Sequence, residues 1–242
     1  MIHLGAGRPA TALPLLLADL HQSLPTGATI DCCLSPRVDT HWNTARAVDL
    51  AIGAGFTVNK RPRCQKECVR LTLTRRHSLP DTVSNDMRLL IVGLNPSPYS
   101  ADHGIAYARP GNRFWPAALA AGLVTVDRDP RHALQHHGLG MTDLVRRSTA
   151  RADQVERTEF SGGFKRVERL AEWLQPAAAC FIGLGAWRQV IDRRASAGIQ
   201  TRTIGGRPVY LMPHTSGLNA HSRLKELAAH LGAAATLADR SR

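Results

Sequence analysis

The sequence predicts an α/β protein, a three-layer αβα sandwich with a short parallel sheet, preceded by a small βαββ appendage. Two observations lead to this prediction. From residue 88 onward, short apolar runs alternate with helical patterns, which is typical of a parallel sheet with helices on both faces. Before residue 78, strand patterns surround one amphipathic helix. We therefore expect the appendage over 1–77, a linker over 78–86 and the larger domain over 87–242.

The appendage is predicted from four segments. Strand patterns cover 28–34, 56–58 and 69–74, and a helical pattern over 44–54 ends at Gly55. Their order, a strand and a helix leading into an antiparallel pair, resembles the closing portion of the class I methyltransferase fold. This resemblance is one of pattern only, so the appendage is interpreted either as a structural remnant or as an accessory that faces DNA.

A glycine pattern at the start of the appendage is not expected to bind a cofactor. Gly5-Ala6-Gly7-Arg8-Pro9-Ala10 satisfies G-x-G-x-x-A, the turn that lets a backbone approach a nucleotide. Pro9 and Pro14 are expected to interrupt the helix that should follow, and no acidic residue ends a second strand about 20 positions later. No cofactor is therefore predicted. A nucleotide- or methyl-donor-binding protein remains a third interpretation of the chain.

The linker and the elements of the larger domain follow in order. Residues 78–86 hold a proline and several turn formers ahead of an apolar run over 88–93, which suits a parallel strand buried on both faces. Asn112 is the expected N-cap of a helix over 113–121, and Gly122 its end. The other predicted elements are strands over 138–144 and 178–183, helices over 160–174 and 187–194, a strand pair over 201–212 and a closing helix over 222–231.

The charge of the chain favours a polyanionic partner. Thirty-one Lys and Arg residues oppose nineteen Asp and Glu residues, which gives a net charge of +12. Seven cations stand against one glutamate between residues 60 and 76: Lys60, Arg61, Arg63, Lys66, Arg70, Arg75 and Arg76. Nucleic acid is the first candidate, because arginine pairs with phosphate oxygens two at a time. A composition bias toward arginine, or a solvated basic face, is the alternative.

The five cysteines and the hydropathy pattern exclude other classes. Five is an odd and sparse number for a disulfide framework, and the spacing of Cys64 and Cys68 is not C-x2-C, so free thiols are expected and no metal. No apolar stretch approaches the roughly 18 residues of a membrane span, and no signal peptide is apparent. We expect a monomeric, cytoplasmic, nucleoid-associated protein without a membrane partner.

Two polar loops follow predicted strands of the larger domain. The first runs from Gly93 through Asn95 to Ser100, where Gly93 permits a tight exit from its strand and the prolines hold Asn95 in place. The second covers 213–219, and an aromatic and arginine-containing segment over 107–115 lies between the two loops. Because ligands of open α/β sheets bind outside the carboxyl ends of the strands, these loops are the predicted site.

Together these motifs resemble those of the mismatch-specific uracil-DNA glycosylases, the branch that includes the eukaryotic thymine-DNA glycosylases. The similarity runs from about Arg88 to Leu231 and rests on three motifs in order: Gly-Leu-Asn-Pro at 93–96, Asn-Arg-Phe-Trp at 112–115 and Ser-Gly-Leu at 216–218. It implies a uracil-DNA glycosylase-like fold and the removal of uracil, thymine or damaged pyrimidines opposite guanine in double-stranded DNA.

The resemblance also implies roles for individual residues. Asn95 positions the attacking water, the main chain of Leu94 faces the base, Tyr107 stacks on the extruded base, and Ser97 and Ser100 add polar groups near the pocket. His214 lies close to the deoxyribose. The expected DNA contacts are the wedge residues Ser216, Gly217 and Leu218 with their neighbour Asn219, and the arginines Arg109 and Arg113.

These assignments predict a slow, monofunctional enzyme. Asn95 can only orient water, and neither loop has a lysine that forms a Schiff base, so the product should be an abasic site. Ser97 and His214-Thr215 depart from the family pattern of glycine and Asn-Pro; we expect His214 to be neutral, and Asp102 not to act as a base. The alternative is a mismatch-DNA-binding module on the same scaffold that has lost turnover.

Overall fold

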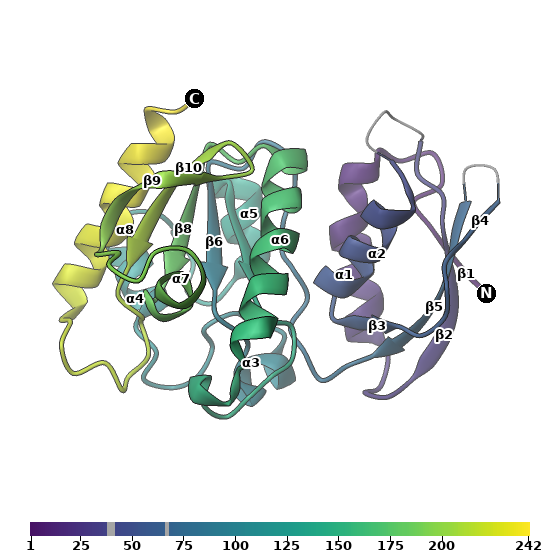
Figure 1. The fold of residues 1–242 in the computed structure, drawn as a ribbon, viewed down its shortest axis with the longest axis horizontal. Helices are drawn as coiled ribbons and strands as arrows, with labels where there is room; N and C mark the ends of the chain where they lie inside the picture. Colours follow the sequence, from purple (N-terminus) through teal and green to yellow (C-terminus); the bar gives the residue numbers. More distant parts are fainter. Residues whose placement is uncertain (38–41, 66–67) are drawn as a thin grey trace.

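The computed structural model describes residues 1–37, 42–65 and 68–242 and contains two α/β units, each with its own sheet (Figure 1). The N-terminal unit comprises β1 (Ile2–Leu4), α1 (Leu13–Ser23), β2 (Thr29–Leu34), α2 (Thr44–Gly53), β3 (Phe56–Val58), β4 (Arg63–Gln65) and β5 (Cys68–Arg75). Its strands lie in the order β1-β2-β5-β3, with β4 paired to β5. β1 is parallel to β2, whereas β5 runs antiparallel to β2 and β3.

The predicted βαββ pattern is present as β2-α2-β3-β5, and the structure adds β1, α1 and the short β4. The expectation that prolines would interrupt a helix after Gly7 was wrong. Pro14 lies in the first turn of α1, where a backbone N–H has no partner within the helix and proline costs nothing. Pro9 precedes the 3-10 turn Ala10–Ala12 that leads into α1.

Alternation along β5 separates two faces of the N-terminal sheet. Val69, Leu71 and Leu73 are buried in the core with residues of α1 and α2, while Arg70 between them is exposed. One face of this sheet therefore carries the helices and the other is open.

The expectation of free thiols was wrong for two cysteines, because Cys33 of β2 and Cys68 of β5 form a disulfide.

The C-terminal unit is the predicted three-layer sandwich. Its sheet has the order β7-β6-β8-β10-β9, formed by Leu139–Asp143, Leu89–Gly93, Ala178–Ile182, Arg207–Met212 and Gly198–Ile204. The first four strands are parallel and β9 is an antiparallel edge strand. The carboxyl ends of four strands, and the loops that leave them, consequently meet at one edge of the sheet.

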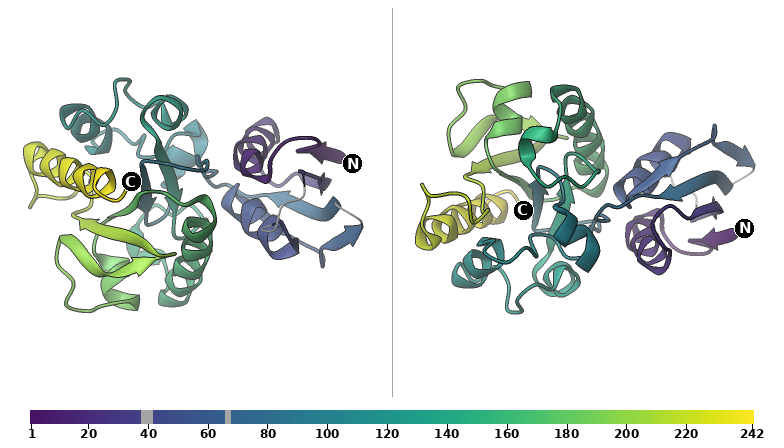
Figure 2. Two further views of the ribbon diagram at one scale, coloured as in Figure 1. Left: turned by 90° about the horizontal axis from the view of Figure 1, so that it is seen from above. Right: turned by 90° about the horizontal axis from the view of Figure 1, so that it is seen from below.

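Helices cover both faces of this sheet (Figures 1 and 2). α4 (Phe114–Ala120), α5 (Pro130–His137) and α8 (Leu224–Asp239) lie on one face, and α6 (Arg157–Leu174) and α7 (Gly185–Val190) on the other. Leu89 and Ile91 of β6 pack in the first layer, and Leu90 and Val92 in the second. A short helix, α3 (Pro98–His103), follows β6 near the carboxyl edge, and the 3-10 turn Ala152–Gln154 precedes α6.

The two units are packed together rather than joined by an exposed linker. The core of the N-terminal unit is continuous with the layer beneath α6. Asp49 of α2 accepts two hydrogen bonds from Arg169 of α6, and the Arg46 guanidinium lies 4.4 Å from the centroid of the Trp173 ring. Within 78–86, predicted as the linker, Ser78 and Asp81 are buried. No helix in the described ranges is long and apolar enough to cross a membrane.

His21 makes the stability of the protein sensitive to acid. This buried histidine of α1 donates from Nε2 to the Arg76 carbonyl at 3.1 Å and packs edge-on against Phe56. Burial, reinforced by the charge of Arg75, lowers the pKa of His21 to about 4. The folded state therefore favours the neutral ring. The contribution of the neutral ring to the free energy of unfolding is fully present above the pKa of an unfolded histidine, near 6.5. It is lost as the pH falls toward 4, by about 2 kcal/mol at pH 4.5.

Urea unfolding at pH 7.0 and pH 4.5 measures this loss. The variant His21→Gln keeps a donor for the Arg76 carbonyl but has no titrating ring, so the difference between the two pH values should shrink. His3→Gln, which changes an exposed histidine, is the control and should keep the wild-type difference. An equal pH dependence in His21→Gln and in the wild type would show that another group is responsible.

Candidate active site

The loops after β6 and β7 are laced together by backbone hydrogen bonds. The Gly93 carbonyl accepts from the Leu144 N–H at 3.0 Å, and the Leu94 carbonyl from the Val145 N–H at 2.9 Å. The Thr149 N–H reaches the Pro96 carbonyl at 3.2 Å. These hydrogen bonds hold the predicted catalytic loop against the loop after β7, residues 144–149, which the sequence analysis did not include in the site.

Asn95 is fixed by its amide nitrogen. Nδ2 donates to Thr149 Oγ1 at 2.7 Å, to the Arg147 carbonyl at 3.2 Å and to the Pro96 carbonyl at 3.3 Å. Carbonyl groups only accept, so the amide nitrogen must be the atom that faces them. Oδ1 accepts no hydrogen bond from the part of the chain that the structure describes. It is therefore available to orient a water molecule.

Tyr107 lies next to the start of the same loop. A Cβ on Gly93 would lie 2.9 Å from the Tyr107 hydroxyl and 2.1 Å from Asp143 Oδ1. The glycine is thus required for clearance between two side chains, not for the tight exit that the sequence suggested. Tyr107 has a φ of +57° and stacks on Phe114, with ring centroids 4.3 Å apart. One face of the Tyr107 ring is consequently covered by protein.

Asp143, the last residue of β7, was missed by the sequence analysis. It is buried beside Gly93 and Tyr107, and burial, with the nearby charge of Asp81, raises its pKa to about 6, although the Arg146 and Arg166 guanidinium groups oppose the shift. The signal in the sequence was a polar Thr-Asp pair at the carboxyl end of an otherwise apolar strand.

Ser97 and Ser100 both serve the local structure. Ser97 is the N-cap of α3, and its Oγ accepts from the Ser100 N–H at 3.1 Å. The buried Ser100 Oγ accepts from the Ser97 hydroxyl at 3.2 Å and from the Ala108 N–H at 3.3 Å. Ser100 thereby connects the loop after β6 to the segment that carries Tyr107.

The second predicted loop leaves β10 beside the end of β8. The Cβ of His214 lies 3.4 Å from the Cβ position of Gly183, and its carbonyl accepts from Asn219 Nδ2 at 2.7 Å. Burial and the positive charge of Arg113 lower the pKa of His214. The lowered pKa favours the neutral imidazole, the form that the sequence analysis expects in the working enzyme.

Arg113 clamps this loop. Its guanidinium donates to the carbonyls of Ser216 at 3.2 Å, of Asn219 at 2.7 Å and of Ser222, and its backbone N–H reaches the Thr215 carbonyl at 2.9 Å. The structure thus gives Arg113 a supporting contact within the protein, and its predicted contact with DNA stays a prediction.

The tip of the clamped loop is exposed. A Cβ on Gly217 would lie 2.9 Å from the Gly111 carbonyl, so the loop touches the segment between Tyr107 and Phe114. Beyond this contact the Leu218 side chain is 83% exposed, and Arg109 is also exposed on the neighbouring segment. An apolar side chain held outward on a fixed loop is suited to insertion between bases.

The space enclosed behind Tyr107 is small. A cavity of about 10 Å³ lies between Tyr107, Met141 and Asp143, which is room for one water molecule and not for a nucleobase. Among the described residues no group of three His, Cys, Asp or Glu side chains is arranged to hold a metal ion. Any base that binds here must occupy the open side of the carboxyl edge or widen this cavity.

The sequence model of the uracil DNA glycosylase superfamily matches residues 80–237, which is more than half of the chain and includes both predicted loops. The chain belongs to this superfamily. Its members are DNA glycosylases of the hydrolase class that act in DNA repair, and the carboxyl-edge site described above lies within the matched region.

A similar solved structure is the solution NMR structure of a candidate uracil DNA glycosylase from Methanosarcina acetivorans. It is 22% identical in sequence, with a TM-score of 0.43, and the similarity covers 66% of this chain and 96% of that protein.

Proposed function

We propose that this DNA glycosylase hydrolyses the N-glycosidic bond of uracil, and by extension of thymine or a damaged pyrimidine, mispaired with guanine in double-stranded DNA. The observation that supports it best is the Asn95 amide, whose nitrogen is held by three acceptors while Oδ1 faces no protein donor in the described part of the chain. We further propose that it acts as a monomer in the cytoplasm, on the nucleoid.

Extrusion of the base is assigned to Leu218 and Tyr107. Removing a base from the stack costs a few kcal/mol, and the cost is smallest at a mismatch. Leu218 would fill the vacated space in the duplex, and the ring face of Tyr107 that is turned away from Phe114 would stack on the base. The proposed contacts with the DNA backbone follow from the position of Leu218, because Ser216, Gly217 and Asn219 lie on the same loop.

Hydrolysis is assigned to a water molecule bound to Asn95 Oδ1. Bond cleavage builds positive charge on the sugar and negative charge on the departing pyrimidine, so main-chain groups near Leu94 would face the leaving base. A neutral His214 near the sugar adds no charge that opposes the oxocarbenium-like centre. An amide takes no full proton from water, so the reaction depends on a good leaving group. Without a lysine in either loop, the product is an intact strand with an abasic site.

Excision from a panel of labelled duplexes tests the proposal. Duplexes with G·U, G·T and A·U pairs, and one with only matched pairs, are incubated with excess enzyme and then treated with hot alkali. The expected result is cleavage after alkali only, strongest for G·U. Absence of an abasic product at any enzyme excess would defeat the proposal. Tight, salt-sensitive binding of the mismatch without excision would instead support the binding module that has lost turnover.

Asp143 should give excision a dependence on pH. Below its pKa near 6 the carboxyl group is neutral and can donate a hydrogen bond, whereas above it the carboxylate repels the pyrimidine anion that departs beside Tyr107. We therefore expect the single-turnover rate to fall roughly threefold or more as the pH rises from 5 to 7.5. Asp143→Asn keeps the shape of the side chain without its charge.

The rate of Asp143→Asn should be nearly constant over the same range of pH. A profile that keeps the wild-type inflection would assign it to a group other than Asp143. Thermal unfolding of the variant, recorded in parallel, separates an effect on the site from a loss of folded protein.

A further inference from the structure

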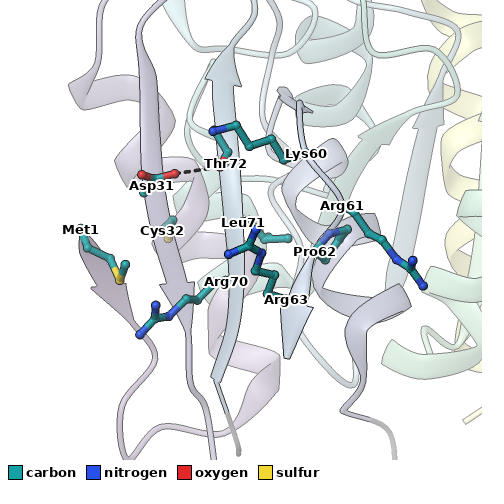
Figure 3. A pocket seen from close by; sticks show the side chains of 10 residues that line it. All are labelled: Met1, Asp31, Cys32, Lys60, Arg61, Pro62, Arg63, Arg70, Leu71 and Thr72. Carbon is teal, nitrogen blue, oxygen red and sulfur yellow. Dashed lines mark hydrogen bonds between the residues drawn. The ribbon is translucent and has the colours of Figure 1, made fainter. Parts of the chain in front are cut away.

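The open face of the N-terminal sheet carries a basic hollow that the glycosylase site does not use. It has a volume of about 750 Å³ and lies over β2 and β5, on the face opposite to α1 and α2 (Figure 3). Four cationic residues in the described part of the chain line it, namely Lys60, Arg61, Arg63 and Arg70. The hollow belongs to the segment 60–76 in which the sequence concentrates positive charge.

Two of these arginines are direct cross-strand partners. Arg63 of β4 is paired with Arg70 of β5 in the antiparallel register, so their side chains leave the same face of the sheet. Like charges at opposed positions destabilise a sheet. Both side chains are exposed, and neither forms an ion pair with a carboxylate in the part of the chain that the structure describes. An anion bound between them would offset the repulsion.

Among the described residues that line the hollow, Asp31 is the only one with a carboxylate, and it does not neutralise this charge. Asp31 Oδ1 accepts a hydrogen bond from the Thr72 hydroxyl at 2.7 Å, the dashed line in Figure 3. The side chains of Lys60, Arg63 and Arg70 extend over β2 and β5, whereas Arg61 points away from them (Figure 3). Several cations are thus spread along one face, which suits an extended polyanion better than a single small ion.

The lining also indicates which part of a nucleic acid would bind. Among the described residues, the uncharged ones that line the hollow are Met1, Cys32, Pro62, Leu71 and Thr72, and none of them is aromatic. Proteins that hold single-stranded bases stack them on aromatic side chains. A surface that offers only arginine and lysine contacts the phosphates, and these carry no sequence information.

We propose that this hollow is a second DNA-binding site, which holds the sugar-phosphate backbone independently of sequence and of any mismatch. It rests on the proposed function only in taking DNA as the polyanion. In this arrangement the glycosylase unit selects the base, and the N-terminal sheet increases the time that the enzyme stays on undamaged duplex.

The test compares binding of a fully matched duplex by the full-length wild-type protein and by the double variant Arg63→Ala/Arg70→Ala. Fluorescence anisotropy over a range of salt concentrations should show about tenfold weaker binding near 0.1 M salt. The slope of log K against log salt should be smaller by about 1.8, as expected for two lost phosphate contacts. Arg193→Ala/Arg194→Ala removes the same charge from exposed positions of the glycosylase unit and should leave the slope close to that of the wild type.

The outcomes are distinguishable from those that test the glycosylase. Saturating amounts of the Arg63/Arg70 variant should excise uracil at the wild-type single-turnover rate, because the carboxyl-edge site is unchanged. Equal salt slopes for the two double variants would overturn the proposal. A thermal shift with pyrophosphate that depends on Arg63 and Arg70, with unchanged DNA binding, would also overturn it and assign the hollow to a small anion. If the wild type excises nothing, the proposed function fails while the binding result can still be read.

Discussion

Replacing Asn95 with alanine is expected to lower the rate of uracil excision from a G·U duplex at least tenfold while the affinity for the duplex changes little. The side chain is proposed to contact only the attacking water and the neighbouring loop, so its loss affects the transition state more than the bound ground state. A tenfold loss corresponds to about 1.4 kcal/mol of transition-state stabilisation. The remaining rate would come from extrusion of the base and stabilisation of the leaving anion.

Single-turnover excision at saturating enzyme measures the rate, and anisotropy with the same duplex measures binding. Asn85→Ala is the control, because Asn85 is exposed and its side chain bonds only to the adjacent Asp86 among the contacts described. This control should excise at the wild-type rate. If Asn95→Ala also does so, water must be oriented by another group. If both excision and binding fail, the loop has lost its structure.

The three acceptors around Asn95 Nδ2 explain why an amide suits position 95. Nδ2 faces two carbonyl groups and the Thr149 hydroxyl. A carboxylate would turn an acceptor toward the Arg147 carbonyl and lose the contacts that fix the group. The orientation of Oδ1 therefore depends on the loop after β7.

Most elements could be predicted from the sequence because their signals are local. The apolar run of β6 and the amphipathic pattern of α2 specify their structures without reference to the rest of the chain. The helices α3 and α5 were missed although each begins with a local signal. Ser97-Pro98 and Asp129-Pro130 both place a capping side chain directly before a proline at the first helical position. Pro98 had been interpreted only as one of the prolines that hold Asn95 in place, and the Asp129-Pro130 pair had not been used.

The candidate site was predicted only in part because some of its contacts join distant segments. Asn95, Tyr107 and Leu218 follow from motifs that can be read in order along the chain. The position of Asp143 beside Gly93 depends on the pairing of β6 with β7, whose residues lie some fifty positions apart. The clamp made by Arg113 likewise depends on loop carbonyls, which no sequence pattern specifies.

Asp81→Ala is expected to destabilise the protein by about 3–5 kcal/mol, the range found when one partner of a buried ion pair is removed. The Asp81 carboxylate lies between two guanidinium groups, with Oδ1 2.9 Å from Arg146 Nη1 and Oδ2 2.8 Å from Arg166 Nη1. All three side chains are largely buried. Without the carboxylate, two like charges would remain buried close to each other.

The same cluster joins the N-terminal unit to the candidate active site. Asp81 Oδ1 accepts from the Thr142 hydroxyl at 2.7 Å, and Arg166 donates to the Asp143 carbonyl at 2.8 Å. The cluster therefore holds the last two residues of β7. Arg146 also donates to the Gly53 carbonyl at 2.8 Å in the N-terminal unit. Loss of Asp81 should therefore loosen the packing of the two units and the support of the carboxyl edge together.

Thermal unfolding measures the effect, and for a chain of this length the expected loss corresponds to a melting temperature lower by roughly 10 °C. Asp153→Ala is the matched control, because Asp153 pairs with Arg151 on the surface, where solvent screens the pair and its contribution to stability is small. Equal shifts in the two variants would show that the buried cluster stabilises no more than a surface pair. A larger shift in Asp81→Ala, accompanied by slower excision at a temperature where the variant is folded, would show that the N-terminal unit supports the active site through these charges.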